Sequence, residues 1–323
     1  MSQTHTQTAT AFAYTPYSLL YRGNSINGWL SAFLSYVALQ QQGKTDIRFA
    51  PLCGHRIITS SEAPQWAGTH VLMLDMDDLN PIVFMEAGAY SVECISSLPS
   101  QETSTVVNTW RRWYGDADAP FWLLSLDRIT RWASPSWEDR CLREVLMPVA
   151  HMPPSDALRA TNALMTWMMN PAGAEFQALM TQGQAKLMEK DLALGALLKA
   201  KGVVHDIQPS DAEKWGLTAE WIGLKAFLLE NHDYVLDTNE AAHLVFMNYP
   251  DVAIFVNYRK KVRRSQDNGR KLGLVYVYSA RSKAFDLTTG GFFQGRAGSA
   301  GALVPLSEGD MPFVPFRSEI MII

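Results

Sequence analysis

The sequence has little charge, little cysteine and no long uncharged apolar run. Charged residues make up 19% of the 323 residues and hydrophobic residues 47%, which is typical of a globular chain and excludes a disordered one. The formal net charge is -4, so no chain-wide charge favours nucleic-acid binding, although a local basic patch remains open. No uncharged apolar run approaches the roughly 20 residues that cross a bilayer, so we expect no membrane span.

Cysteine is scarce, and the amino terminus lacks a secretion signal. Cys53, Cys94 and Cys141 lie far apart without the spacing of a metal site. An odd number of cysteines without a disulfide framework suits a reducing compartment. Residues 1–16 are polar and rich in threonine, with neither a basic start nor an apolar run. We therefore expect a flexible amino-terminal arm on a cytoplasmic protein.

The first half of the chain alternates between strand and helix patterns. Four apolar runs that end in polar residues predict strands: "YSLLYRG", "DIRFAPL", "THVLMLDMDD" and "YSVECISS". Between the first two, "INGWLSAFLSYVALQQQG" has apolar residues at helical spacing and closes with Gly43, a helix C-cap signal. This alternation predicts a mainly parallel α/β sheet. Residues 119–132, "APFWLLSLDRITRW", fit either a strand or a buried helix.

Polar residues that follow the strands of a parallel sheet share one edge, where α/β proteins place their chemistry. The residues predicted for this edge are 22–27, 75–78, Ser96, Ser97 and Asp127.

From about residue 150 the pattern becomes helical and then returns to strands. Helices are predicted over residues 157–169, 173–202 and 212–230. Strands are predicted over residues 242–249, 252–262, 271–282 and 302–306. The helix over 173–202 has an apolar stripe, which we expect to pack in a core. Its members are Phe176, Leu179, Met180, Leu187, Leu194, Leu197 and Leu198.

One dense basic run, "YRKKVRR", covers residues 258–264. A solvated hairpin loop over residues 260–271 explains it. Contact with a nucleic-acid backbone, helped by Tyr249 and Tyr258, is the alternative.

The order of these segments resembles the DHH (Asp-His-His) phosphoesterase superfamily over residues 17 to 305. "LLYRGNSINGWLSAF" resembles the first motif, a strand followed by His-Gly-Asn-x-x-Asp-Gly and a helix. "VLMLDMDD" resembles the second, a strand that ends in a metal-binding Asp. "SVECISSLPS" lies where the family has Asp-His-His, and "LSLDRITRW" resembles the Asp-Arg motif. "VYVYSARSKAFDLTTGGFFQGRAGSAG" resembles the substrate-binding DHHA1 domain, with its Ser-x-Arg-Ser and Gly-Gly-x-x-His patterns.

The resemblance implies a two-domain α/β fold. A parallel-sheet DHH-like domain is expected over residues 17–160, a helical connector over 161–215, and a smaller mixed-sheet DHHA1-like domain over 216–323. It also implies phosphodiester hydrolysis with two Mn²⁺ or Mg²⁺ ions. Many family members form homodimers.

The sequence departs from the family at the metal ligands. Arg22 stands at the position of the first His and Asn27 at that of the Asp, while Ile95, Ser96 and Ser97 stand where the family has Asp-His-His. These residues offer a cation, an amide and hydroxyls in place of anionic or imidazole ligands. We expect Arg22 to pair with Asp75 or Asp127, the two acids that remain.

The expected function is therefore a catalytically inactive member that acts by binding. No resident metal is expected; if the protein is active, it uses Mn²⁺ or Mg²⁺ at Asp75, Asp77 and Asp127 as a phosphodiesterase or oligoribonuclease. The partners expected are a nucleotide, a short single-stranded nucleic acid or a protein assembly. The ligand-binding candidates are Arg22, Asn27, Ser96, Ser97, Arg281, Ser282, Gly290, Gly291 and Arg296.

Overall fold

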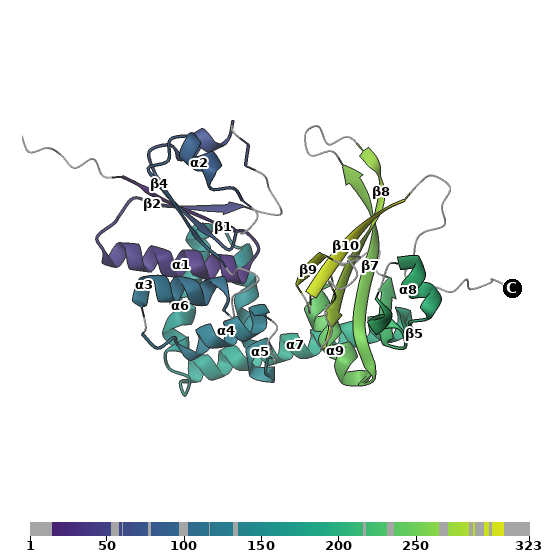
Figure 1. The fold of residues 1–323 in the computed structure, drawn as a ribbon. Helices are drawn as coiled ribbons and strands as arrows, with labels where there is room; N and C mark the ends of the chain where they lie inside the picture. Colours follow the sequence, from purple (N-terminus) through teal and green to yellow (C-terminus); the bar gives the residue numbers. More distant parts are fainter. Residues whose placement is uncertain are drawn as a thin grey trace, which may run out of the picture. The chain divides into compact units, whose positions relative to one another are not determined.

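The computed structural model divides the chain into two units, Met1–Leu187 and Met188–Ile323 (Figure 1). It describes residues 15–52, 58–59, 61–76, 79–96, 103–115, 117–131, 135–215, 218–230, 236–264, 271–283, 287, 294–296 and 299–306.

The first unit contains a parallel four-stranded sheet of order β2-β1-β3-β4. The strands are β1 (Tyr17–Arg22), β2 (Ile47–Leu52), β3 (His70–Leu74) and β4 (Ser91–Ile95). All four match predicted strands. Because they are parallel, the residues that follow β1, β3 and β4 meet at one edge, as the sequence predicts.

Alternate residues of this sheet enter two hydrophobic cores. Leu19 and Leu72 pack on the side that carries most of the helices, whereas Leu20 and Met73 pack on the side of η1 and α2 (Figure 1). Both faces are buried, which explains the nearly continuous apolar runs of β1 and β3. The helical elements of this unit are α1 (Ile26–Gln41), η1 (Ala63–Trp66), α2 (Ile82–Glu86), α3 (Thr105–Tyr114), α4 (Phe121–Arg131), α5 (Trp137–Leu146), η2 (Met147–His151) and α6 (Pro154–Met168).

Residues 121–131 form helix α4, so the helical alternative holds for the described part of this segment. Trp122, Leu123, Leu126 and Ile129 enter the main core of the unit at helical spacing. Asp127 therefore lies within a helix and does not follow a strand, contrary to the prediction.

The second unit is built on a mixed six-stranded sheet of order β5-β6-β7-β8-β10-β9, in which only β6 and β7 pair in parallel. Its strands are β5 (Gly202–Asp206), β6 (Lys225–Glu230), β7 (Val252–Arg264), β8 (Lys271–Ser282), β9 (Gln294–Arg296) and β10 (Ser299–Leu306). Its helical elements are α8 (Pro209–Trp215), η3 (Ala219–Trp221) and α9 (Thr238–Asn248). The predicted fold class, a parallel-sheet unit followed by a mixed-sheet unit, is confirmed.

Three segment predictions for this unit are wrong. Residues 242–249 belong to α9, which connects the parallel strands β6 and β7; such a connection needs a crossover. Residues 225–230 are strand β6 and not a continued helix. The hairpin loop predicted over residues 260–271 is wrong at residues 260–264 and at Lys271, which lie in strands β7 and β8, and residues 265–270 lie outside the described residues. Strand β5 also falls within the segment assigned to the connector.

Helix α7 (Ala174–Lys201) carries the predicted apolar stripe. Phe176 and Leu179 enter the main core of the first unit, and Leu194 and Leu198 enter a core of the second. The stripe is thus core, as predicted.

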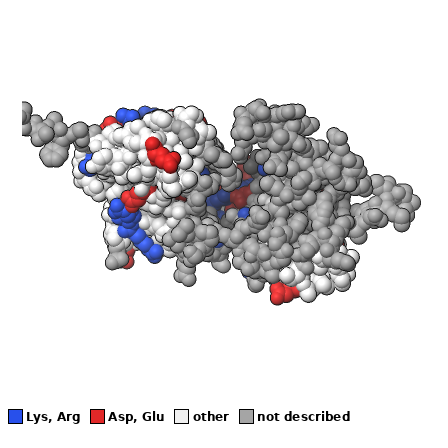
Figure 2. Space-filling model, turned by 45° about the horizontal axis from the view of Figure 1, so that its top comes forward, with Lys and Arg blue, Asp and Glu red and all other residues white. Residues whose placement is uncertain are grey.

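No helix in the described ranges combines the length and the apolar composition needed to cross a membrane. On the face shown in Figure 2, the described surface of the first unit is mostly uncharged, with charged side chains in small separate groups.

Candidate functional site

The candidate site lies where β1 and β3 end, at the start of helix α1. Ser25 is the N-cap of α1, and its Oγ accepts a hydrogen bond of 3.2 Å from the Gly28 amide. A Cβ atom on Gly28 would lie 2.5 Å from the carbonyl oxygen of Arg22. Glycine at this position therefore allows the first turn of α1 to pack directly against the end of β1.

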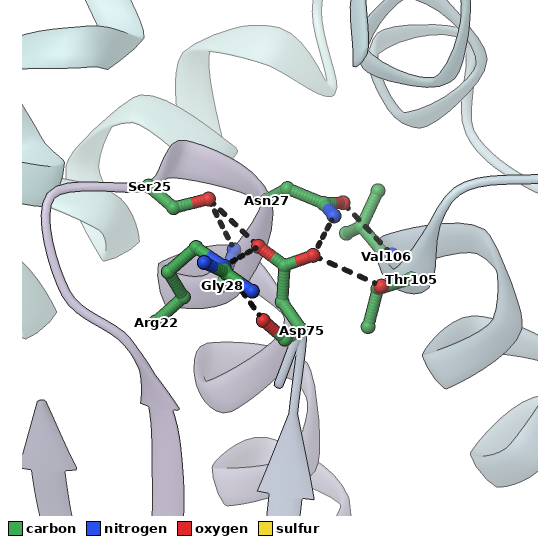
Figure 3. A network of polar contacts seen from close by, with 7 residues as sticks. All are labelled: Arg22, Ser25, Asn27, Gly28, Asp75, Thr105 and Val106. Carbon is green, nitrogen blue, oxygen red and sulfur yellow. Dashed lines mark hydrogen bonds and ion pairs between the residues drawn. The ribbon is translucent and has the colours of Figure 1, made fainter. Parts of the chain in front are cut away.

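Asp75, the residue after β3, is the centre of a network of polar contacts (Figure 3). Its Oδ1 accepts hydrogen bonds from Asn27 Nδ2 at 2.8 Å and from Thr105 Oγ1 at 3.2 Å. Its Oδ2 accepts one from Ser25 Oγ at 2.9 Å. Arg22 Nε donates to the Asp75 main-chain carbonyl at 2.9 Å and lies 3.7 Å from Oδ2. The predicted Arg22–Asp75 ion pair is confirmed.

The backbone of Asp75 supports this arrangement. Its φ is 61°, in the left-handed region that aspartate and asparagine enter more readily than other residues with a Cβ. The side chain is only 14% exposed. Burial raises the pKa of Asp75 above its ordinary value, even though the hydrogen bonds from Ser25, Asn27 and Thr105 and the charge of Arg22 oppose that shift.

Asn27 links Asp75 to helix α3. While its Nδ2 donates to Asp75, its Oδ1 accepts a hydrogen bond of 3.0 Å from the Val106 amide in the first turn of α3. An ionised aspartate at position 27 could accept from Val106 but could not donate to Asp75. The amide of Asn27 therefore has a structural use in this network.

Asp127 caps the same helix from α4. Its Oδ1 accepts a hydrogen bond of 2.7 Å from the amide of Ser104, the N-cap residue of α3. Its Oδ2 pairs with Arg131, at 3.0 Å from Nε and 2.6 Å from Nη2. The alternative partner predicted for Arg22 is thus already engaged by Arg131.

The third motif position is only partly described. The carbonyl of Ser96 accepts a hydrogen bond of 2.9 Å from Asn108 Nδ2, which orients the chain after β4. Ser97 and Asp77 lie outside the described residues. Within the described ranges, no group of three or more His, Cys, Asp or Glu side chains could hold a metal ion.

In the second unit, Arg281 near the end of β8 is the candidate with a defined environment. Its Nε donates to Asn239 Oδ1 at the start of α9, and its Nη1 donates to the Ala280 carbonyl at 2.7 Å. Burial lowers the pKa of Arg281, and the nearby charge of Asp237 opposes that shift. Among the described residues, neither hydrogen-bond acceptor of this guanidinium carries a charge.

The strand register relates Arg281 to a second predicted residue. Arg281 is opposite Ser299 of β10, and Ser299 is opposite Arg296 of β9. Arg281 and Arg296 thus occupy one row across the sheet, two strands apart. Ser282, the last residue of β8, is opposite Ile254, whereas Gly290 and Gly291 lie outside the described residues.

Ser25 falls within the predicted range 22–27, but the sequence analysis did not identify three other groups that contact the two aspartates: Thr105, Ser104 and Arg131. Arg131 had a readable signal, because it follows Asp127 by four residues, the spacing of a helical ion pair. Thr105 and Ser104 had none, since their contacts join segments 30 and 23 residues apart.

No family model and no curated protein matches the sequence. Among solved structures, the chain is similar to the pGpG-specific phosphodiesterase PggH from Vibrio cholerae, with 11% identity over 91% of this chain and 94% of that chain and a TM-score of 0.41. It is also similar to RecJ in complex with Mn²⁺ from Thermus thermophilus, with 14% identity over 91% of this chain, half (50%) of the RecJ chain and a TM-score of 0.41. Both are proteins of the DHH superfamily. Similarity at this level assigns this chain neither a family nor an activity.

Proposed function

We propose that this chain is a DHH-phosphoesterase-like protein that binds a phosphorylated ligand of the nucleotide class without hydrolysing it. The observation that supports the proposal is the set of contacts made by the Asp75 carboxylate. Both carboxylate oxygens accept hydrogen bonds from protein side chains, and the Arg22 guanidinium lies beside them. The protein itself supplies the donors and the positive charge that metal ions would otherwise provide.

The described residues do not fit a two-metal centre. Two divalent cations held close together need several anionic oxygens or imidazoles around them. Around Asp75, the described side chains offer a guanidinium, an amide and two hydroxyls. Asp127 is bound to the Ser104 amide and to Arg131.

The binding part of the proposal rests on Arg281. Two hydrogen-bond acceptors of this partly buried guanidinium are neutral groups, and the nearby charge of Asp237 offsets part of its positive charge. Phosphate suits such a group, because a guanidinium can donate two parallel hydrogen bonds to it. The position of Arg296 in the same row supports a second contact to the same ligand. The homodimer that the resemblance implies and the protein assembly expected among the partners remain predictions.

Turnover assays test the absence of hydrolysis. The purified chain is incubated with Mn²⁺ or Mg²⁺ and either a generic phosphodiester or a 5′-phosphorylated dinucleotide. We expect no product above the metal-only control. Metal-dependent cleavage that Asp127→Asn abolishes, in a variant with an unchanged circular dichroism spectrum, would overturn the proposal and favour a phosphodiesterase with a reorganised site.

Calorimetric titration tests the binding. We expect the dinucleotide to bind the wild-type chain and Arg281→Gln to weaken its affinity at least about tenfold, because a charged hydrogen-bonding pair contributes roughly 1.5–3 kcal/mol. The matched control is Lys283→Gln, which removes an exposed cation only two residues away that donates to the Pro250 carbonyl. Equal losses in both variants would indicate general charge attraction and contradict a site at Arg281.

A further inference from the structure

Asn257 is an amide in a part of the mixed sheet whose neighbouring side chains are apolar. It lies in β7, opposite Leu229 of β6, and Phe255 precedes it by two residues on the same face. Leu229 and Phe255 are fully buried in a core to which helices α7 and α9 also contribute. Asn257 itself is only 9% exposed. A polar side chain at such a position lowers stability unless its groups are hydrogen-bonded.

The side-chain oxygen of Asn257 is a buried acceptor. Among the residues that the structure describes, no group donates a hydrogen bond to this Oδ1. Most buried polar side-chain atoms of native proteins have a partner, and an exception indicates a role other than stability. Because the fold already keeps this acceptor away from water, a ligand that donates to it gains a hydrogen bond without a further cost of removing water from the amide.

The strand register places Asn257 beside Arg281 on one face of the sheet. Phe255 of β7 is opposite Arg281 of β8, and two residues further along β7 Asn257 is opposite Ser279. Residues two apart share a face, so these are successive rows, roughly 7 Å apart along the strands. In the row of Asn257, β8 contributes the half-buried Ser279 and β10 contributes Gly301, which has no side chain. A ligand bound at Arg281 therefore has the row of Asn257 next to it.

The chemistry of a nucleotide limits which of its groups donates to Asn257. The phosphate of a nucleotide offers acceptors, so the donors are the sugar hydroxyls and the N–H groups of the base. The sugar is bonded directly to the phosphate, whereas the base lies beyond the sugar. With the phosphate at Arg281, a position only one row away favours a sugar hydroxyl over the base. Within a nucleotide chain the 3′-oxygen is esterified, which leaves the 2′-hydroxyl as the donor of the sugar.

We propose that Asn257 is a specificity-determining residue, which accepts a hydrogen bond from the 2′-hydroxyl of a ribonucleotide whose phosphate is bound by Arg281. This inference rests on the proposed function, because it requires a ligand of the nucleotide class at Arg281. It narrows that ligand to the ribonucleotides, since the 2′-hydroxyl is the group by which proteins distinguish RNA from DNA.

Calorimetric titration with two matched ligands tests the inference without any variant. The ligands are a 5′-phosphorylated dinucleotide in its ribose form and the same dinucleotide in its 2′-deoxyribose form. We expect the wild-type chain to bind the ribose form about tenfold more tightly. Equal affinities would overturn the role of Asn257 and leave the phosphate site at Arg281 standing. If the wild-type chain binds neither form, the proposed function fails, and this inference fails with it.

The variant Asn257→Leu assigns the preference to this residue. It should lower the affinity for the ribose form about tenfold, to that of the deoxyribose form, and leave the affinity for the deoxyribose form unchanged. By contrast, Arg281→Gln should weaken the binding of both forms by the same factor, because both carry the phosphate. Equal losses for the two forms in Asn257→Leu would mean that the amide only supports the fold, and would contradict the inference.

Thermal melts without ligand provide the structural control. Asn257→Leu should melt no lower than wild type, because it removes an acceptor to which no described group donates. Asn257→Ala gives the same binding test without the larger volume of leucine. The matched control is Asn248→Ala, which removes an exposed amide of α9 that donates to the Leu244 carbonyl, and it should leave both affinities unchanged. If Asn248→Ala abolishes the preference for ribose as fully as the Asn257 variants, the inference is wrong.

Discussion

The two units differ in the groups that contact their buried charged side chains. In the first unit, Asp75 has Arg22 beside it, Asp127 is bound by Arg131, and Asp139 is bound by Arg128. In the second unit, Arg281 has neutral acceptors, and the sheet around it contains cations without a single acid from β7 to β10.

This difference indicates where a ligand contributes most. A charge that the fold already pairs gains little from an incoming ion, whereas a partly desolvated charge with neutral hydrogen-bond acceptors gains more. The edge of the parallel sheet is therefore expected to act as structure, and the mixed sheet as the binding surface. Substitutions in both units test this contrast.

The largest effect is expected from Asn27→Asp, which replaces the amide at the centre of the network with a carboxylate. It removes the donor to Asp75 and brings a second carboxylate into hydrogen-bonding range of a buried one. We expect the free energy of unfolding at pH 7 to fall by about 3–5 kcal/mol, measured by denaturant titration.

Asn27→Ala is the control, because it removes the same hydrogen bonds without adding charge and should cost only about 1–3 kcal/mol. If Mn²⁺ returns Asn27→Asp to wild-type stability, this edge still binds a cation, and the contrast between the two units fails there.

Gly28→Ala tests the close packing that positions the network. A Cβ atom would lie 2.5 Å from the Arg22 carbonyl, so the start of α1 must move away from β1. We expect a loss of about 3 kcal/mol in unfolding free energy. Gly195→Ala, in the interior of α7 with open space around the new Cβ atom, should instead stabilise the protein by up to about 1 kcal/mol. Similar effects of the two changes would contradict the packing argument.

Arg131→Gln and Arg281→Gln compare the two kinds of arginine directly. The first leaves the buried Asp127 without its cation and should cost about 2 kcal/mol, less than a fully buried pair because Arg131 is 30% exposed. The second removes a charge that lacks a charged acceptor and should change stability by less than about 1 kcal/mol. Thermal melts of both variants without ligand provide the comparison. A larger loss of stability for Arg281→Gln than for Arg131→Gln would contradict the contrast between the two units.

The smallest effect expected is on the pH dependence of stability, to which Asp75 and Asp139 of the first unit contribute in opposite directions. Burial raises the pKa of Asp75 in the folded state above 3.8. Its contribution to stability is therefore greatest below pH 3.8 and is lost as pH rises through the folded pKa. For Asp139, burial alone would raise the pKa, but the hydrogen bonds from Arg128 and from the Ser136 amide lower it below 3.8. Its contribution is full above pH 3.8 and is lost as pH falls through the folded pKa.

Unfolding free energies of Asp75→Asn and Asp139→Asn, measured across the acid range against wild type, separate these contributions. Asn is compatible with the positive φ of residue 75. The difference from wild type should change with pH in opposite directions for the two variants. Parallel curves would mean that donors around Asp75 outweigh its burial.

The sequence was most informative where local pattern and topology agree. Apolar runs that end in polar residues predicted the four parallel strands and brought Arg22 and Asp75 to one edge. Only the geometry could reveal Thr105 and the Ser104 amide as donors, because helix α3 reaches both aspartates from a separate segment. Residues 242–249 have an apolar pattern that suits either a helix or a strand. They form a helix because the parallel strands β6 and β7 need a crossover connection. The composition of the basic run favours a solvated loop, but β6 pairs with β7 only up to Tyr258, so the charged residues that follow lie where β7 has no described neighbour on that side and charge is tolerated.

Helix α7 has a practical consequence for dividing the protein. The boundary between the two units, after Leu187, falls inside this uninterrupted helix. A truncation there would leave each fragment with a frayed helical end, and Leu187 itself is fully buried. Fragments intended for separate expression should therefore both include Ala174–Lys201, so that Phe176 and Leu198 each stay on an intact helix.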